Sequence, residues 1–259
     1  MTVPPLPLGP DEPAPFELLR ASGHSRFVLC CDHAGKLLPR ALGTLGLDSN
    51  ERQRHIAWDI GAAGLARALS ALLDAPLILQ PYSRLAIDCN RPLAADDSIA
   101  VSSEDTPIPG NLGLSAADAQ ARAAAIFEPY HTQLRQLIDA RMGLTPAPLL
   151  VSVHSFTPVY RGDRRPWDVG VLYDRDARLA NCLLELLRAE QRWQVGDNQP
   201  YRVDDEHDYT VKVHAEHRGL GYVELEIRQD LIADAAGQTA WAGHLARLLP
   251  RAAAQIADR

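Results

Sequence analysis

Two apolar runs in this sequence each end on a histidine. The first reads FVLCCDH over residues 27–33, and the second reads LLVSVH over residues 149–154. Short, uninterrupted apolar runs bounded by turn residues are typical of strands buried on both faces of a largely parallel sheet. Ligands of open α/β sheets bind at the carboxyl ends of such strands. We therefore expect His33 and His154 to meet at one sheet edge and to form part of a metal site.

Apolar runs alternate with helical patterns along the rest of the chain, which predicts a single α/β domain. Strands are expected at 27–32, 77–80, 84–88, 149–153, 169–173 and 222–227, and helices at 52–74, 115–143, 176–192, 209–218 and 237–257. Ser115 begins the second helix, because Asp118 follows three residues later in a capping-box pattern. Residues 92–114 form a long polar loop, and loops of this length are often functional.

The N-terminus is rich in proline, with six prolines before residue 16. Such runs favour extended chain, so we expect residues 1–20 to form an extended or disordered arm and residues 21–259 a single catalytic domain. The N-terminus lacks the basic segment and apolar helix of a signal peptide. Since no segment approaches the roughly 20 apolar residues that span a membrane, we expect no membrane association.

The net charge of −7 gives no electrostatic support to a nucleic-acid partner. An anionic ligand would need a local group of arginines. The four cysteines, Cys30, Cys31, Cys89 and Cys182, form no C-x-x-C pair, and we expect them to be reduced and mostly buried. Reduced cysteines are typical of cytoplasmic proteins, so the sequence favours a cytoplasmic location. It gives no oligomeric state.

A third metal ligand should come from an element that begins at the same sheet edge. Catalytic zinc is commonly held by histidines and a carboxylate, with one position left open. Asp59 and Glu51 both stand near the start of the helix expected at 52–74. Either carboxylate could instead stabilise a helix N-terminus. Spacing alone does not separate the two.

The segment 222–228 reads YVELEIR, and this alternation predicts a strand. Glu224 and Glu226 then point to one face, which in antiparallel sheets is often the solvated face. Glu226, however, stands near the C-terminal end of the strand, beside the edge expected to carry the histidines. A carboxylate close to a metal-activated water is the usual general base in amide hydrolysis, so Glu226 is the candidate base.

Two groups of arginines stand close to the expected edge. Arg84 and Arg91 belong to one segment together with Asn90, and the second group lies in the loop RGDRR at 161–165. Arginine is favoured where a carboxylate is bound through two hydrogen bonds, although exposed arginines also form weak surface ion pairs. In an acidic protein, these two groups predict a small anionic substrate.

The other histidines have weaker claims to a metal. His214 and His217 stand three residues apart on an expected helix, which places them on one face and also suits metal binding. No carboxylate-rich strand end obviously faces them. His131 is expected inside a long helix, either as a packed residue or as one that supports the ligands. His207 is expected in an acidic, solvated loop, with a contribution to the mouth of the site as the alternative.

Together, these segments resemble the N-formylglutamate amidohydrolase family, also called N-formylglutamate deformylases. The matching stretches are DHAG at 32–35, WDIGA at 58–62, DCNRP at 88–92, HSFTP at 154–158, RPWDVGVLY at 165–173, NQPY at 198–201, HAEHRG at 214–219 and ELEIRQDLI at 224–232. They occur in order over about residues 27–232, most of the chain. The resemblance therefore does not depend on any single motif.

The resemblance implies a zinc exopeptidase-like fold, which is a three-layer α/β/α structure with a mixed, largely parallel central sheet. It also implies one divalent metal ion, with zinc favoured, held by His33, Asp59 and His154. Asp59 is preferred to Glu51 only on this analogy, because Asp59 lies in a matching stretch and Glu51 does not.

The same resemblance implies an activity and roles for further residues. The reaction would be hydrolysis of N-formyl-L-glutamate, or of a related small anionic N-acyl amino acid, to formate and the free amino acid. Glu226 would act as general base, and Arg84 would donate to the oxyanion. The carboxylates of the substrate would be held by Asn90, Arg91 and Arg228.

Two other functions compete with this one. A cysteine-nucleophile amidase would use Cys31 or Cys89, but Cys31 lies inside an apolar run, whereas a reactive thiolate needs an electropositive, partly exposed setting. A non-catalytic binding protein would keep the fold and lose catalysis. The presence of both histidines, Asp59 and Glu226 argues against it.

Overall fold

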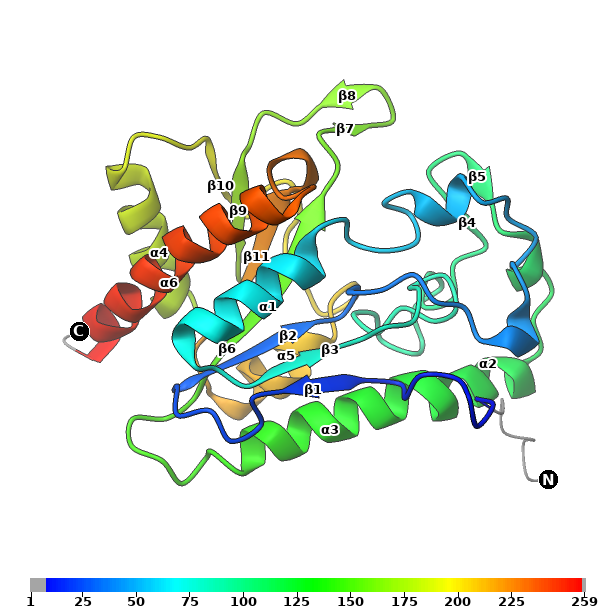
Figure 1. Cartoon of the computed structure of the whole chain (residues 1–259), viewed down its shortest axis with the longest axis horizontal. Coiled ribbons are helices and arrows are strands. Elements are labelled where there is room, and N and C mark those ends of the chain that lie inside the picture. Colours follow the sequence, from blue (N-terminus) through cyan, green and yellow to red (C-terminus); the bar gives the residue numbers. More distant parts are fainter. Residues whose placement is uncertain (1–7, 258–259) are drawn as a thin grey trace.

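A seven-stranded sheet forms the centre of the molecule (Figure 1). The computed structural model describes residues 8–257. The strands of the sheet are β1 (Glu17–Leu19), β2 (Phe27–Cys31), β3 (Leu77–Leu79), β6 (Leu149–Phe156), β9 (Val169–Leu172), β10 (Val195–Asp197) and β11 (Tyr222–Arg228). Their order across the sheet is β1-β3-β2-β6-β11-β9-β10.

Most neighbouring strands run parallel. β3, β2, β6 and β11 are parallel to one another, and β10 is parallel to β9. Only β1 with β3 and β9 with β11 pair antiparallel in this sheet. β2 and β6 are buried along their whole length, which explains why both sequences are uninterrupted apolar runs. The expected mixed, largely parallel sheet is confirmed.

Helices cover both faces of this sheet (Figure 1). The helices α1 (Ala62–Leu73), α4 (Arg178–Ala189) and α6 (Ala235–Ala257) pack on one face, and α3 (Glu128–Asp139) and α5 (Thr210–His214) pack on the other. Alternate residues of β2 contact the two layers: Leu29 packs in the core with α1 and α6, and Val28 packs in the core with α3. The expected three-layer α/β/α architecture is confirmed.

Shorter elements connect these layers. They comprise α2 (Ala116–Arg122), the π-helical segment Ala123–Phe127, the 3₁₀ turns Arg40–Leu42, Glu51–Gln53, Pro109–Asn111, Glu216–Arg218 and Gln229–Leu231, and the hairpins β4 (Ser102–Ser103) with β5 (Thr106–Pro107) and β7 (Val159–Tyr160) with β8 (Asp163–Arg164). Ser115 caps α2 as expected, since its Oγ accepts a hydrogen bond from the Asp118 N–H at 3.1 Å.

The helix expected at 52–74 begins ten residues too early. The structure has a 3₁₀ turn at Glu51–Gln53 and then a loop, and α1 starts only at Ala62. Gly61 precedes α1 with φ +84°, a left-handed conformation that ends any helix arriving from the N-terminal side. The chain before Gly61 is therefore available to shape the sheet edge.

The strand expected at 84–88 is wrong. This segment forms turns, in which the Ala86 N–H donates to the Ser83 carbonyl at 2.9 Å. Leu85 and Ile87 are both buried, so their apolar character reflects burial of a loop beside the site. A short apolar run does not by itself distinguish these two kinds of burial.

Residues 13–19 of the proline-rich N-terminal segment lie along the edge of the sheet. β1 pairs with β3, and the carbonyls of Pro13 and Pro15 accept hydrogen bonds from Tyr82 Oη and Gln80 Nε2 at 2.7 and 2.9 Å. Residues 1–7 of the expected arm fall outside the described residues. Across residues 8–257, none of the helices combines the length and apolar character needed to cross a membrane.

Candidate metal centre and active site

The carboxyl ends of β2 and β6 bring two histidines together. His33 lies just beyond β2, whereas His154 lies inside β6, which continues past the expected strand end to Phe156. Because β2 and β6 are parallel neighbours, both imidazoles reach the same edge. Asp59 lies in the loop before α1, and its N–H donates to the His33 carbonyl at 2.9 Å. This bond holds the loop against the sheet edge.

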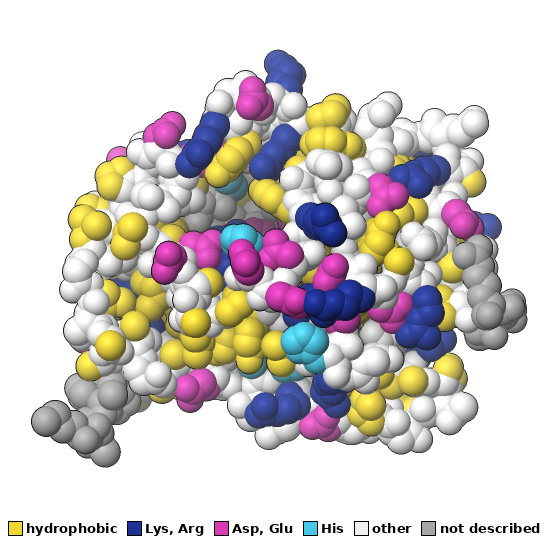
Figure 2. Space-filling model, turned by 180° about the vertical axis from the view of Figure 1, so that it is seen from behind, with side chains coloured by type: hydrophobic (Ala, Val, Ile, Leu, Met, Phe, Trp, Pro, Cys, Tyr) yellow, Lys and Arg dark blue, Asp and Glu magenta, His cyan; other side chains and the backbone are white. Residues whose placement is uncertain are grey.

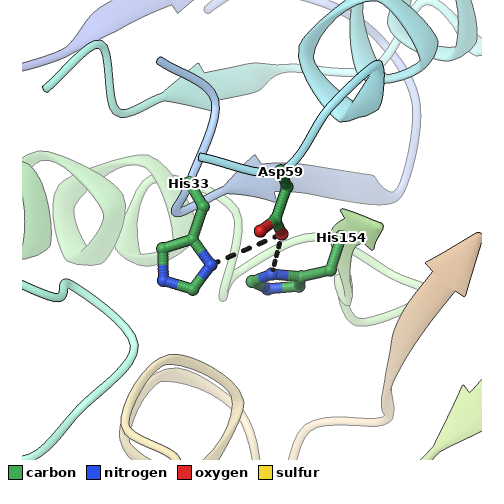
Figure 3. Close-up of side chains that lie close together, drawn as sticks. All are labelled: His33, Asp59 and His154. Carbon is green, nitrogen blue, oxygen red and sulfur yellow. Dashed lines mark hydrogen bonds and ion pairs between the residues drawn. The ribbon is translucent and has the colours of Figure 1, made fainter. Parts of the chain in front are cut away.

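His33, Asp59 and His154 form a compact group of possible metal ligands. One nitrogen or oxygen atom from each lies within 4.8 Å of the others. The Asp59 Oδ2 atom is 3.4 Å from His33 Nδ1 and 2.8 Å from His154 Nδ1 (Figure 3). All three side chains are buried. Two imidazoles and one carboxylate are a donor set that suits zinc and other divalent ions.

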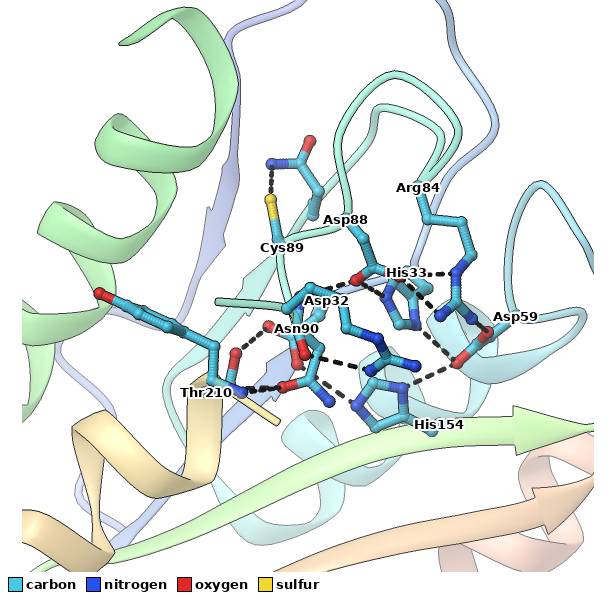
Figure 4. A network of polar contacts seen from close by, with 12 residues as sticks. Asp32, His33, Asp59, Arg84, Asp88, Cys89, Asn90, His154 and Thr210 are labelled. Atoms are coloured by element: carbon cyan, nitrogen blue, oxygen red, sulfur yellow. Dashed lines mark hydrogen bonds and ion pairs between the residues drawn. The ribbon is translucent and has the colours of Figure 1, made fainter. Parts of the chain in front are cut away.

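The remaining nitrogens of the two histidines face oxygen atoms (Figure 4). His33 Nε2 lies 2.7 Å from Asp88 Oδ1, and His154 Nε2 lies 2.9 Å from Ser152 Oγ and 3.3 Å from Asp32 Oδ2. Metal-binding histidines usually donate their second N–H to such a partner, which fixes the ring and leaves the other nitrogen free for the ion. The group therefore fits a divalent metal ion.

The electrostatic environment keeps Asp59 ionised. Burial opposes its charge, yet the two neighbouring imidazoles hold the pKa of Asp59 well below its usual range. Asp88 behaves in the same way: burial opposes its ionisation, but the Arg84 guanidinium and His33 lower its pKa. Both carboxylates are therefore charged, Asp59 beside the two imidazoles and Asp88 beside His33 and Arg84.

Glu51 does not take part in this group. Its Oε2 atom pairs with Arg54 Nη1 at 2.6 Å and accepts a hydrogen bond from Thr106 Oγ1 at 2.9 Å. Among the described residues, the set of possible metal ligands contains Asp59 and not Glu51. The structure thus favours Asp59 on geometry, where spacing in the sequence left both carboxylates open.

Glu226 lies beside this group with a carboxylate oxygen that has no partner. The strand β11 places Glu226 opposite His154 of β6. Its side chain is 5% exposed, and Oε2 makes no hydrogen bond to the described residues. Burial, reinforced by the charge of Asp59, raises the pKa of Glu226 to about 8. A buried, unpaired carboxylate of this kind is a candidate proton acceptor.

These side chains lie at the base of a cavity of about 470 Å³. Figure 2 shows the hollow on this face of the molecule, with histidine and acidic side chains beside it. The lining includes His33, Asp59, His154 and Glu226, together with Ser102 and Tyr160. The long loop expected at 92–114 therefore contributes part of the wall.

Arg84, Asn90 and Arg91 all line the cavity, but most of their polar atoms already have partners. Arg84 Nη2 pairs with Asp88 Oδ2 at 2.6 Å, while its Nη1 lies 3.7 Å from Asp59 Oδ1. The Asn90 Oδ1 accepts the Thr210 N–H at 3.0 Å. Among these three side chains, Arg84 is the one whose charged group lies within ion-pair distance of Asp59, the candidate ligand.

The structure places Arg228 away from this role. Arg228 is not among the residues that line the cavity. Its guanidinium pairs with Asp168 Oδ1 at 2.9 Å and with Asp230 Oδ1 at 2.7 Å. The expectation that Arg228 holds a carboxylate of the substrate is therefore not supported, because both acidic partners already neutralise it beside β11.

The other histidines separate in the folded chain. His131 and His214 are buried and stacked, with His131 Nδ1 at 3.0 Å from His214 Nε2. Burial lowers the pKa of His131 to about 4, and burial together with His131 lowers that of His214 to about 3. His217 is mostly exposed, because α5 ends at His214. Among residues 8–257, neither His214 nor His217 joins a group of possible metal ligands.

The sequence did not reveal that Asp32 and Asp88 contact the side chains of the two histidines. Asp32 precedes His33 directly. Its carboxylate accepts a hydrogen bond from Thr210 Oγ1 at 2.9 Å (Figure 4) and another from Tyr130 Oη at 2.7 Å. The signal in the sequence was the position of Asp32 at the end of an apolar run, since an aspartate buried there must have polar partners. Its partners come from other elements, so the sequence alone did not reveal them.

The cysteines do not form a reactive site. All four are free and buried. Burial raises the pKa of the Cys31 and Cys89 thiols above the usual range for cysteine. A nucleophilic thiol needs the opposite shift, so the structure gives no support to a cysteine-nucleophile amidase.

The chain is similar to known proteins over most of its length. The N-formylglutamate amidohydrolase family profile matches residues 25–233. The crystal structure of gene product Atu2144 from Agrobacterium tumefaciens is 38% identical with a TM-score of 0.90, over 94% of this chain and 96% of that one. N-formylglutamate amidohydrolase from Ralstonia eutropha JMP134 shares the fold at 21% identity and a TM-score of 0.71, over 95% and 99% of the two chains. No curated protein matches the chain by sequence.

The profile covers well over half of the chain. The matched range includes Glu226 and the three candidate metal ligands, His33, Asp59 and His154. The resemblance inferred from the ordered motifs is confirmed. So is the class of reaction, since the family hydrolyses an amide bond of a small substrate. On this match, the chain is a hydrolase that belongs to the N-formylglutamate amidohydrolase family.

Proposed function

We propose that the protein hydrolyses N-formyl-L-glutamate, or a closely related N-acyl amino acid, to formate and the free amino acid. The observation that carries this proposal is the placement of Glu226, whose buried and unpartnered Oε2 atom lies opposite His154. A proton acceptor beside a two-histidine, one-carboxylate group is the arrangement that metal-assisted amide hydrolysis requires. The name of the Ralstonia relative supports the choice of substrate.

His33, Asp59 and His154 would hold one divalent ion, and we favour zinc because of the nitrogen-rich donor set. When bound, the ion would act as a Lewis acid on the amide carbonyl and would lower the pKa of a water molecule. Asp88 and Asp32 orient the two imidazoles through their far nitrogens. The protein thus prepares the ligands before the ion arrives.

Glu226 takes the proton from the attacking water and then gives it to the nitrogen of the leaving amine. Both transfers use the same oxygen, and Oε2 has no other hydrogen bond within the described residues. Burial, which raises the pKa of Glu226 above the ordinary value of a glutamate, suits both steps, because a group that accepts and then donates a proton works best when its pKa is near the working pH.

Arg84 is the proposed donor to the oxyanion, because its Nη1 atom lies 3.7 Å from Asp59 Oδ1 and has no closer carboxylate. Arg91 is the proposed contact for one substrate carboxylate. Its Nε pairs with Asp97 at 2.9 Å, and the guanidinium lines the cavity. Asn90 Nδ2 lies 3.3 Å from Asp208 Oδ1. The side-chain amide of Asn90 would therefore hold the cavity wall in place and also contact the substrate.

The direct test is release of formate from N-formyl-L-glutamate by the full chain, before and after chelation and after zinc is restored. We expect turnover by the zinc-loaded protein, loss after chelation and recovery on adding zinc. Absence of turnover in every metal state would defeat the substrate assignment. A panel of other N-acyl amino acids would then show whether the acyl group or the amino acid was misassigned.

The two rival functions give different results in the same assay. A cysteine nucleophile predicts activity that survives chelation and is lost in Cys31→Ser or Cys89→Ser. A binding protein predicts full ligand affinity in the metal-free protein with no formate release. We also propose a cytoplasmic location, because free, buried cysteines suit a reducing compartment.

A further inference from the structure

The cavity carries more negative than positive charge. Eight carboxylates and four guanidinium groups line it. An anionic substrate would be repelled by such a lining unless some of the arginines remain free to bind it, since like charges in a partly buried site cost several kcal/mol. The pairing state of each arginine therefore decides where a carboxylate of the substrate can bind.

Two of the four arginines already have a carboxylate partner in the protein. Arg84 pairs with Asp88 at 2.6 Å, and Arg91 pairs with Asp97 at 2.9 Å. Arg91 also donates to the carbonyl of His207. These contacts hold the inner wall of the cavity together. With Arg91 assigned to one carboxylate of the substrate, they leave little capacity for a second one.

The other two arginines have no carboxylate partner. Arg161 lies over the Tyr160 ring, 5.5 Å from its centroid, and makes one long hydrogen bond, from Nη2 to the Glu104 carbonyl at 3.5 Å. Arg202 makes no hydrogen bond or ion pair with any residue in the range 8–257 that the structure describes. Both side chains are exposed and both line the cavity. Figure 2 shows basic side chains on the same face as the hollow.

An aromatic clamp places these two arginines on adjoining segments. The Arg165 guanidinium stacks on Tyr160 at 4.6 Å and on Tyr201 at 4.7 Å, measured to the ring centroids. Its Nη1 also donates to Tyr201 Oη at 2.8 Å. Arg161 directly follows Tyr160, and Arg202 directly follows Tyr201. The contacts of Arg165 with both tyrosines therefore hold together the two segments whose arginines have no carboxylate partner.

The turn that carries Arg161 is well defined. Arg161 and Gly162 both have positive φ, +49° and +87°, which is the backbone of a type I′ turn between β7 and β8. The pairing of Val159 with Arg164 fixes the register of this hairpin. The position of Arg161 at the cavity rim is therefore set by the hairpin.

We propose that Arg161 and Arg202 bind the side-chain carboxylate of an acidic N-acyl amino acid and so determine the specificity for an anionic side chain. This inference rests on the proposed function, because it assumes that the scissile amide lies at the buried histidines. The amino-acid side chain then points to the rim, where free guanidinium groups face an otherwise acidic lining. A distal carboxylate is thereby preferred over a neutral side chain.

The test compares N-formyl-L-glutamate with N-formyl-L-glutamine, which has nearly the same shape and no side-chain charge. The proteins are the zinc-loaded wild type, Arg161→Gln, Arg202→Gln and the double variant. Arg164→Gln is the matched control, because Arg164 is exposed on the same hairpin but does not line the cavity. Each single variant removes one positive charge, so a general charge effect appears in the control as well.

We expect the wild type to prefer N-formyl-L-glutamate. The double variant should lose about 10- to 100-fold in kcat/KM for this substrate, mostly through KM, as for the loss of a charge-assisted hydrogen bond. Turnover of N-formyl-L-glutamine should change little, and Arg164→Gln should behave as the wild type.

Two outcomes overturn the inference in different ways. If the double variant hydrolyses both substrates with the wild-type preference, or loses both equally, the two arginines do not select the side chain, while the proposed function stands. If the zinc-loaded wild type hydrolyses neither substrate, the proposed function fails, and this inference fails with it.

Discussion

Glu226 of β11 lies directly opposite His154 of β6, and the two strands run parallel. Residues paired in this way on neighbouring parallel strands present their side chains to the same face of the sheet. The carboxylate and the imidazole therefore line one cavity, although they stand 72 residues apart in the chain. The pairing register, which is a property of the backbone, places the candidate base beside the candidate metal group.

Replacing Glu226 with glutamine should abolish most of the activity and leave the metal bound. The amide cannot accept the proton of the attacking water, so kcat should fall about 10²- to 10⁴-fold, the usual contribution of a general base. Steady-state kinetics with metal analysis of the purified variant measures both quantities. Near-normal turnover in Glu226→Gln would remove this residue from the proposed role.

Asp59→Asn should lose the metal, whereas Glu51→Gln should keep it. The neutral amide is a much poorer ligand than the carboxylate that lies 2.8 Å from His154 Nδ1. Glu51 contacts Arg54 and Thr106 and does not join the ligand group. Metal content after dialysis, measured by elemental analysis, distinguishes the two. The opposite pattern would identify Glu51 as the ligand.

Asp88→Asn should weaken metal binding about 10- to 100-fold, the usual effect of removing an outer hydrogen-bond partner. The Asp88 carboxylate lies 2.7 Å from His33 Nε2 and makes the imidazole a better electron donor. Asp97→Asn is the control, because Asp97 lines the same cavity but pairs with Arg91 instead of a histidine. Competition with a chelator of known affinity gives both constants. Equal effects in the two variants would contradict a specific role for Asp88.

The buried pair of His131 and His214 should make the protein less stable in acid. Their pKa values of about 4 and about 3 lie below the ordinary value of 6.5. At pH values between the folded and the ordinary pKa, these histidines bind protons in the unfolded chain but stay neutral in the folded chain. The free energy of unfolding therefore falls as the pH falls. Each imidazole contributes a slope of about 1.4 kcal/mol per pH unit inside this window.

Urea unfolding from pH 7 to pH 4 tests this slope. His214→Asn should show a shallower loss of stability than the wild type over this range, because one of the two neutral imidazoles is gone. The comparison of the two proteins removes the contributions of the other titrating groups. Parallel curves for the wild type and His214→Asn would show that His214 is not the source of the slope.

Gly61→Ala should destabilise the fold and disturb the metal group. A Cβ on Gly61 would lie 2.1 Å from the Ile232 carbonyl oxygen, and the backbone there has φ +84°. The combined strain and collision should cost about 3–5 kcal/mol. Asp59 lies two residues before this glycine, so metal affinity should fall as well.

Gly219→Ala is the matched control for this collision. Gly219 also has positive φ, +68°, but a Cβ there would meet nothing within 4 Å. This variant should lose only about 1–2 kcal/mol, the cost of the left-handed backbone alone. Chemical unfolding of both variants gives the comparison. Equal losses would mean that the approach of Ile232 to Gly61 is easily relieved.

The sequence by itself determined the buried parallel strands and the two histidines at their carboxyl ends. These features depend on the local pattern of apolar residues, because a strand buried on both faces must be apolar at every position. The ordered motifs around His33 and His154 also identified the family. Such signals lie within a few residues of one another and do not require knowledge of the path of the chain.

Only the tertiary structure decided which polar groups pair. Asp59 reaches the histidines because the chain before α1 stays a loop, whereas Glu51 is directed to Arg54. Arg228 is neutralised by two aspartates, and Arg202 is left free. The physical reason is that the charges around a charged side chain set both its ionisation and its capacity to bind a ligand. Those partners come from distant segments that only folding brings together.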